Sequence, residues 1–165
     1  MAFSSPGEEL PPHQPQCFGC GPRNQAGLHI TAVMTDEGVR ASVRFDDSHE
    51  GGPGIAHGGI VAAALDDAMG FLIHHVGRPF VTARLEVDYR RPVPIDADLS
   101  LEARVESRQA RKVHAAAELR DSTGGVLAEA RALFITVRSS HFLDASPASR
   151  RRIEELQGEA GQLAP

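Results

Sequence analysis

The sequence predicts an α+β domain in which one long central helix is wrapped by an antiparallel sheet of about six strands. Residues 59–76 place apolar side chains at helical spacing, and the remaining face is mostly alanine and glycine. A helix that is apolar nearly all round is a buried one. Six other segments alternate apolar and polar residues, which predicts strands with one buried face. Such a sheet would bury that face against the helix.

The expected strands lie on both sides of the helix. Residues 28–34 and 39–45 alternate around Asp36-Glu37-Gly38, which predicts a hairpin. Residues 46–56 are turn formers almost throughout and predict a loop just before the helix. After Gly77-Arg78-Pro79, period-two alternation predicts four further strands, at residues 81–89, 99–105, 113–119 and 126–137.

The length and composition predict a single globular domain. The chain has 165 residues and 41% hydrophobic residues, enough to fill one core. Residues 1–16 hold four prolines and little apolar content, so we expect a flexible lead-in. The domain then covers residues 17–142. Residues 143–165 form a C-terminal tail that includes a short charged helix.

The charge balance and the apolar runs exclude some classes of partner. A formal net charge of −5 offers no basic face for a phosphate backbone, so no nucleic-acid partner is expected. No stretch approaches the roughly 18 apolar residues of a membrane span, and the N-terminus resembles no export signal. We therefore expect a soluble cytoplasmic protein with no membrane partner.

Cys17 and Cys20 are the two cysteines, in C-x-x-C spacing. A structural zinc site needs four ligands, and with His13 these cysteines make three. We expect reduced thiols in a structural loop, with metal or redox work as the less favoured reading.

Gly58 and Gly59 lie where the helix should begin. Their N–H groups have no intrahelical acceptor, and no side chain blocks the approach of a ligand. Together with the positive end of the helix dipole, they could hold the charge that develops on a carbonyl oxygen under attack. The alternative is an ordinary glycine turn that leads into a helix.

Asp66 and Asp67 place two carboxylates in the middle of an apolar helix. Such groups are costly to bury unless they are hydrated, paired or used in chemistry. One of them could face a wet cleft and act as a general base or nucleophile. The alternative is an ion pair with an arginine such as Arg84 on the neighbouring sheet.

The spacing of these groups predicts a dimer. Asp66 follows His57 by nine residues, which is on the order of 10 Å along a helix. One substrate carbon cannot lie about 3 Å from both ends of that segment. Two antiparallel copies of the helix could bring Gly58 of one chain to Asp66 of the other, giving a homodimer with shared sites.

Four short motifs strengthen this interpretation. They are Cys17-Phe18-Gly19-Cys20-Gly21-Pro22 with Gly27-Leu28, the run Gly-Gly-Pro-Gly-Ile-Ala-His-Gly-Gly at residues 51–59, Leu65-Asp66-Asp67-Ala68-Met69-Gly70, and Tyr89-Arg90-Arg91-Pro92-Val93-Pro94. In these motifs, across residues 17–142, the chain strongly resembles the PaaI-like hotdog-fold thioesterases, whose superfamily includes enzymes that act on acyl-CoA.

The resemblance implies roles for particular residues. Gly58 would offer its N–H to the thioester oxygen, and Asp66 matches the catalytic carboxylate. Thr82 fits a position that helps to hold the attacking water, although it could be an ordinary strand threonine. His57 would shape the loop more than transfer protons. Where some relatives carry asparagine or glutamine before the glycine-proline turn, this chain has Glu50-Gly51-Gly52.

The phosphates of coenzyme A would need cationic partners. Arg90 and Arg91 could provide them, or else Arg108, Arg111 and Lys112, because guanidinium groups suit phosphate geometry. The alternative for each is a solvated charge at a strand edge.

These observations lead to a functional hypothesis. We expect hydrolysis of an acyl-CoA to free acid and CoA, with no metal and no cofactor beyond the CoA of the substrate. The active form would be a hotdog dimer or a dimer of dimers. A non-catalytic acyl-CoA-binding hotdog module is the alternative. A dehydratase or hydratase is a third reading, but the Gly-Gly to Asp spacing does not match its expected groups.

Overall fold

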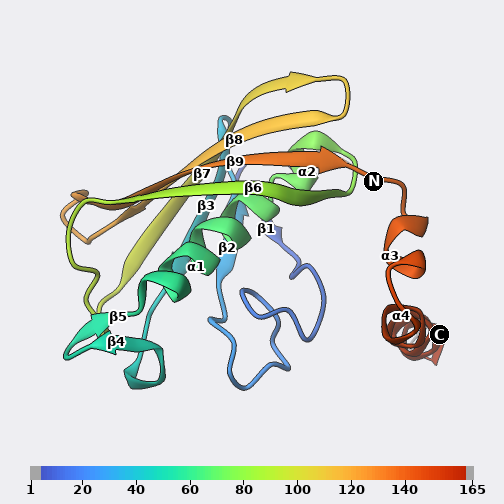
Figure 1. Cartoon of the computed structure of the whole chain (residues 1–165), viewed down its shortest axis with the longest axis horizontal. Helices are drawn as coiled ribbons and strands as arrows, with labels where there is room; N and C mark the ends of the chain where they lie inside the picture. Colours follow the sequence, from blue (N-terminus) through green and yellow to red (C-terminus); the bar gives the residue numbers. More distant parts are fainter. Residues whose placement is uncertain (1–4, 163–165) are drawn as a thin grey trace.

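The structure, a computed structural model, describes the backbone of residues 5–162 and the side chains of residues 5–158. Its main feature is a seven-stranded antiparallel sheet in the order β1-β2-β3-β7-β8-β9-β6. Its strands are β1 (Glu9–Leu10), β2 (Thr31–Met34), β3 (Gly38–Val43), β6 (Phe80–Tyr89), β7 (Leu99–Gln109), β8 (Lys112–Arg120) and β9 (Val126–Thr136). Helix α1 (Gly58–Gly70) lies across one face of the sheet (Figure 1). The predicted fold class and all six predicted strands are confirmed, and β1 is a seventh strand of this sheet that was not predicted.

Helix α1 buries the face that it turns to the sheet. Val61, Leu65 and Met69 recur every four residues on that face and are at most 1% exposed. Ala64 and Ala68 lie beside them with no exposed surface, and their small side chains let the helix approach the strands closely. The helix contacts β3, β6, β7, β8 and β9. The core therefore lies between α1 and the concave face of the sheet.

Leu119 of β8 provides a test of this core, because it is fully buried on the face that α1 covers. Replacing it with alanine should lower the free energy of unfolding by about 2–5 kcal/mol, from lost apolar burial and the cavity left behind. Val33→Ala on β2 is the control: its side chain is 36% exposed, so we expect a change below about 1 kcal/mol. Urea unfolding of both variants measures the difference. Equal midpoints would contradict this account of the core.

The predicted helix over residues 59–76 is divided in two. Helix α1 ends at Gly70, and the short helix α2 (Ile73–Val76) follows after one tighter turn. Leu72 N–H donates to Met69 O at 3.1 Å, three residues back instead of four. Glycine is a weak helix former, which favours the break at this point. Gly77, with φ 74°, ends α2 in the left-handed conformation.

The expectation that no apolar stretch approaches the length of a membrane span was wrong for the segment Gly58–Val76. The segment is 19 residues long and its mean hydropathy over an 18-residue window is 1.3, so by length and composition it could cross a membrane. The core helix of a folded domain passes the same test, and this segment packs against the sheet. It is thus weak evidence for a membrane span.

The two predicted irregular segments contain regular structure. In residues 46–56 there is a 3₁₀ turn at Asp47–His49, followed by a two-stranded hairpin of β4 (Glu50–Gly52) and β5 (Ile55–Ala56). In the predicted lead-in, β1 pairs with β2 and Leu10 is buried. That pairing holds the N-terminal segment against the domain, so the described part of residues 1–16 is not loose throughout. Residues 1–4 lie outside the described residues.

The C-terminal tail is helical, as predicted. Helix α3 (Ser140–Asp144) and helix α4 (Pro147–Gln162) follow β9 and lie beside the end of the sheet, away from α1 (Figure 1). The described side chains of α4 are mostly exposed. The charged composition of α4 therefore matches its position on the surface.

Candidate active site

His57 caps the N-terminus of α1. Its backbone is extended (φ −61°, ψ 133°), and its Nδ1 accepts a hydrogen bond from the N–H of Gly59 at 2.9 Å. The imidazole therefore has a structural role at this helix end, as the resemblance implied. Because Gly59 already donates to His57, its N–H is not free to bind a substrate oxygen.

Gly58 is the first residue of α1, and its N–H has no hydrogen-bond partner among residues 5–162. It lies at the positive end of the helix dipole, which favours negative charge. Of the two glycines predicted to bind an oxyanion, the geometry favours Gly58 alone.

Tyr89, at the end of β6, holds Gly58 in place. Its hydroxyl donates to the carbonyl oxygen of Gly58 at 2.6 Å, although the residue is 52% exposed. A Cβ on Gly58 would lie 3.3 Å from the phenolic oxygen, so the ring covers the glycine closely. Tyr89 belongs to one of the four sequence motifs, but no role in the site was predicted for it. The sequence feature that could have drawn attention to Tyr89 is its position directly before Arg90-Arg91-Pro92.

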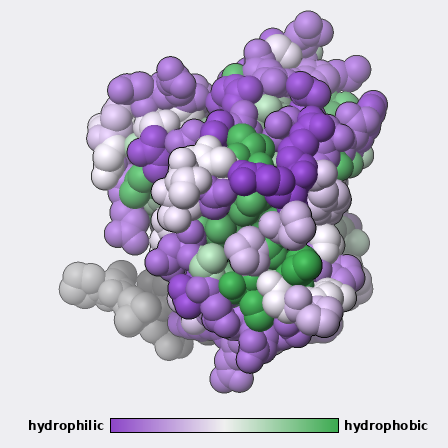
Figure 2. Space-filling model, turned by 90° about the vertical axis from the view of Figure 1, so that its left-hand side faces the viewer, coloured by the Kyte–Doolittle hydropathy of each residue, from purple (hydrophilic) through white to green (hydrophobic). Residues whose placement is uncertain are grey.

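A groove of about 330 Å³ opens beside Gly58. It is lined by Ile55, Ala56, Gly58, Val61, Tyr89, Arg90, Arg91, Pro92 and Val93. Viewed from the side of β4 and β5, the molecule shows apolar residues surrounded by polar ones (Figure 2). A partly apolar groove next to the free N–H of Gly58 suits an acyl or pantetheine chain.

Arg90 and Arg91 lie at this groove, and both have protein partners. Arg90 donates to Glu129 at 3.2 Å. Arg91 donates to the carbonyl of Val126 at 3.0 Å and to Asp121 at 3.1 Å. Both guanidinium groups are about half exposed, so solvent and ligands can reach them.

Asp66 contacts Thr82, the residue predicted to act with it. The Thr82 hydroxyl on β6 donates to Asp66 Oδ1 at 2.9 Å. Burial raises the pKa of Asp66 above that of a free aspartate, while the hydrogen bond from Thr82 opposes the shift by stabilising the carboxylate. The alternative partner, Arg84, pairs with Glu86 instead. The carboxylate is thus half-buried and oriented by one hydroxyl.

Asp67 points to a different part of the molecule. Its Oδ1 lies 3.1 Å from His13 Nδ1 and accepts a hydrogen bond from the Cys17 thiol at 3.3 Å. Burial raises the pKa of Asp67, and the hydrogen bond with His13 opposes that shift. Adjacent helical residues lie about 100° apart around the axis, so the two carboxylates serve separate sites.

One chain does not bring Gly58 and Asp66 to the same point. Helix α1 is continuous between them, and eight residues correspond to about 12 Å along its axis. Strand β6, which carries Thr82, lies at the edge of the sheet and pairs only with β9 in the described part of the chain. The groups predicted to act on one substrate are therefore separated within a protomer.

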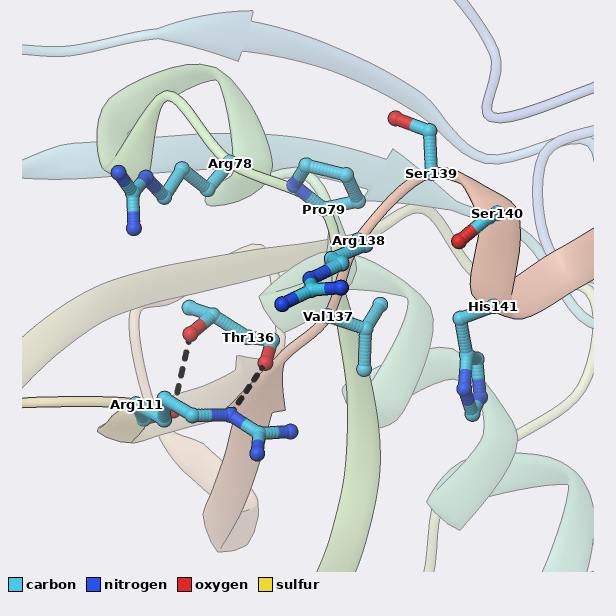
Figure 3. A pocket seen from close by; sticks show the side chains of 9 residues that line it. All are labelled: Arg78, Pro79, Arg111, Thr136, Val137, Arg138, Ser139, Ser140 and His141. Atoms are coloured by element: carbon cyan, nitrogen blue, oxygen red, sulfur yellow. Dashed lines mark hydrogen bonds between the residues drawn. The ribbon is translucent and has the colours of Figure 1, made fainter.

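A cavity of about 750 Å³ lies where β6 begins and β9 ends. Figure 3 shows Arg78, Arg111 and Arg138 around it, with His141 of α3 on one side. Arg111, an alternative phosphate contact, donates to the carbonyl of Thr136 at 3.1 Å. Apart from Arg111, none of the predicted catalytic or substrate-binding residues lines this cavity, so it is separate from the site described above.

Comparisons with known proteins agree with the fold described above. The family model of the thioesterase superfamily matches residues 53–128, which include α1 and β6. Acyl-coenzyme A thioesterase THEM4 of Xenopus laevis is 36% identical over 87 residues, which are 52% of this chain and 39% of that protein. The chain thus matches less than half of the length of this curated relative.

Solved structures give the same result for the fold. The crystal structure of a thioesterase superfamily protein has a TM-score of 0.70 and 30% identity, and covers 73% of this chain and 60% of that one. The Escherichia coli PaaI protein, at 20% identity, is similar in fold, with a TM-score of 0.63 over 67% of this chain and 81% of its own. Family model, curated relative and solved structures agree: this chain is similar to the thioesterase superfamily, and its fold is the hotdog fold.

Proposed function

We propose that this protein hydrolyses an acyl-CoA to a free acid and CoA. The observation that carries the proposal is the composition of α1, which has an unpartnered Gly58 N–H at its positive end and a half-buried Asp66 further along. The relative from Xenopus laevis, named an acyl-coenzyme A thioesterase, supports the same reaction.

Each group has a defined part in the proposed reaction. The Gly58 N–H and the helix dipole hold the thioester oxygen as negative charge develops on it. Asp66 takes a proton from water as the water oxygen attacks the carbonyl carbon. When the C–S bond breaks, that proton passes to the CoA sulfur. Thr82 orients Asp66 and can accept a hydrogen bond from the water. Direct attack by Asp66 is the other mode of action for the same residue.

A complete site needs two chains in this proposal. Two antiparallel copies of α1 would place Gly58 of one protomer opposite Asp66 of the other. Strand β6 supports such an arrangement, because it is ten residues long, lies at the sheet edge and has mostly exposed or half-exposed residues. A long open edge favours pairing with another strand. A homodimer, or a tetramer made of two such dimers, would then be the active form.

Arg90 and Arg91 are proposed to meet the phosphates of CoA. They lie at the groove beside Gly58, and their guanidinium groups are about half exposed. Their carboxylate partners Glu129 and Asp121 hold them in place. The mechanism then uses water and protein groups alone.

The proposal is tested by following release of free CoA from a panel of short, medium, long-chain and aromatic acyl-CoAs. We expect turnover of at least one class, with kcat/KM above about 10⁴ M⁻¹s⁻¹ for the preferred substrate. Calorimetric titration with a non-hydrolysable acyl-CoA thioether runs in parallel. Binding of the thioether without turnover of any thioester would support the alternative, a non-catalytic acyl-CoA-binding module, and would reject hydrolysis.

A further inference from the structure

Four metal-binding side chains meet beside α1, outside the proposed catalytic site. They are His13, Cys17, Cys20 and Asp67, and their ligand atoms all lie within 4.8 Å of one another. Three come from the N-terminal segment and one from the helix. Only three of these ligands were predicted, because nothing in the sequence spacing connects residue 67 to residues 13–20.

The distances between these ligand atoms suit a tetrahedral ion. His13 Nδ1 lies 3.1 Å from Cys20 Sγ and 3.1 Å from Asp67 Oδ1, and Cys17 Sγ lies 3.3 Å from Asp67 Oδ1. Zinc bonds of about 2.0–2.3 Å require ligand-to-ligand edges of roughly 3.3–3.8 Å in a tetrahedron. Small side-chain adjustments would therefore accommodate the ion.

Asp67 has an unsatisfied atom at this cluster. Its side chain is 9% exposed, and Oδ2 is buried with no hydrogen-bond partner in the described part of the chain. A buried carboxylate oxygen without a partner is costly and calls for an explanation. A bound cation would neutralise the carboxylate and remove that cost.

The loop that carries the cysteines is shaped to approach the helix. A Cβ on Gly19 would lie 2.1 Å from Asp67 Cγ, so any larger residue would push the loop away. A Cβ on Gly70 would lie 2.9 Å from the His13 ring. Two glycines, one on each side, thus permit the close contact between the N-terminal segment and α1.

Backbone N–H groups surround the two sulfur atoms. The N–H of His13 donates to Cys20 Sγ at 3.3 Å, and the N–H groups of Cys20 and Gly19 point to the Cys17 sulfur. Thiolate is the form that binds metals, and outer N–H donors of this kind surround metal ligands.

We propose that His13, Cys17, Cys20 and Asp67 together bind one zinc ion in a closed structural site that fixes the N-terminal segment to α1. Two thiolates, an imidazole and a carboxylate in tetrahedral arrangement match the ligand preferences of zinc. Because Asp67 follows Asp66 directly, the ion would also fix the turn of α1 that carries the proposed catalytic carboxylate. The site is independent of the hydrolytic proposal.

The first test is the metal content of the full chain, produced without a histidine tag in zinc-supplemented medium. Plasma mass spectrometry should find about one zinc per chain, and removal by a strong chelator should lower the thermal midpoint. The double variant Cys17→Ser/Cys20→Ser should retain less than about 0.1 zinc per chain, and Asp67→Asn should bind zinc more weakly. Asp66→Asn is the matched control, with the adjacent carboxylate changed and zinc content unaltered.

A second measurement does not depend on the folding of the variants. Cobalt substituted for zinc in the wild-type chain should give the thiolate-to-cobalt charge-transfer band and the visible bands of a tetrahedral site. Wild-type protein with no stoichiometric metal, no zinc uptake on titration and no cobalt spectrum would overturn the proposal. So would a Cys17–Cys20 disulfide found by thiol counting in freshly isolated protein. Either result leaves the acyl-CoA assay unaffected, so the two proposals fail separately.

Discussion

Replacing Asp66 with asparagine is expected to lower kcat by about 10²–10⁴-fold, the usual contribution of a general base. Asparagine has nearly the same shape, and its amide oxygen can still accept the hydrogen bond from the Thr82 hydroxyl, now 2.9 Å from Asp66 Oδ1. It cannot take a proton from water or attack a carbonyl carbon. The loss should therefore fall on kcat, with KM little changed. Steady-state release of CoA from the preferred acyl-CoA measures both constants.

The matched control is Asp36→Asn, an exposed carboxylate in the turn between β2 and β3. It removes the same charge far from α1 along the chain, so kcat should stay near the wild-type value. A kcat for Asp66→Asn equal to that of the control would remove Asp66 from the mechanism. Retained zinc in Asp66→Asn would show that the loss does not come from the cluster around Asp67.

Gly58→Pro should also be inactive, and mixing it with Asp66→Asn should restore activity. Proline lacks the N–H that we assign to the oxyanion hole, and loss of one such donor costs about 10²–10³-fold in kcat. Proline is tolerated at the first position of a helix, and the extended backbone of His57 is the conformation that a following proline favours. The variant should thus fold while it loses the N–H.

In a mixed dimer, one site combines the intact Gly58 of one chain with the intact Asp66 of the other, and the second site carries both defects. Random exchange of chains between equal amounts of the two variants makes half of the dimers mixed. Each mixed dimer has one working site of two, so the mixture should regain about one quarter of wild-type activity. Co-expression with two different tags isolates the mixed dimer. Its activity should be about half that of wild type, since one of two sites works.

Two outcomes would contradict the shared site. A mixed dimer no more active than its parents would show that each chain uses its own Gly58 and Asp66. A protein that is monomeric and active at high dilution, by sedimentation over a concentration series, would exclude the dimeric site altogether. Gly58→Ala, which keeps the N–H, is the control for the added Cβ, which would lie 3.3 Å from the Tyr89 hydroxyl.

The predictable parts of the fold are those recorded in local periodicity. Alternation along β2, β3, β6, β7, β8 and β9 follows from one buried sheet face, and each strand was found at its expected place. The apolar run of α1 predicted a buried helix, but the break after Gly70 depends on hydrogen bonds of a single turn. The pairing of β1 with β2 was missed, because two residues are too few to show a period.

Within the proposed catalytic site, residue types and their spacing predicted which residues take part, but not the contacts between them. The sequence alone predicted Gly58 at the start of a helix and Asp66 and Asp67 as its two carboxylates, and the resemblance selected Asp66 and added Thr82. Tertiary structure decided that His57 accepts the Gly59 N–H and that Tyr89 binds the Gly58 carbonyl. Those bonds depend on where β6 ends relative to α1, which no local pattern encodes.

By itself, the sequence determined the fold class, the position of the helix and the presence of two carboxylates in its middle. Only the tertiary structure decided which way each of the two aspartates points. Asp67 reaches His13 across 54 residues of chain, and Cys17 across 50. Helical spacing placed Asp66 and Asp67 on different faces of α1. Asp67 joins His13, Cys17 and Cys20 only because the loop with Gly19 packs on the helix. Periodicity records burial along one element, whereas a site formed by distant segments depends on how those elements pack.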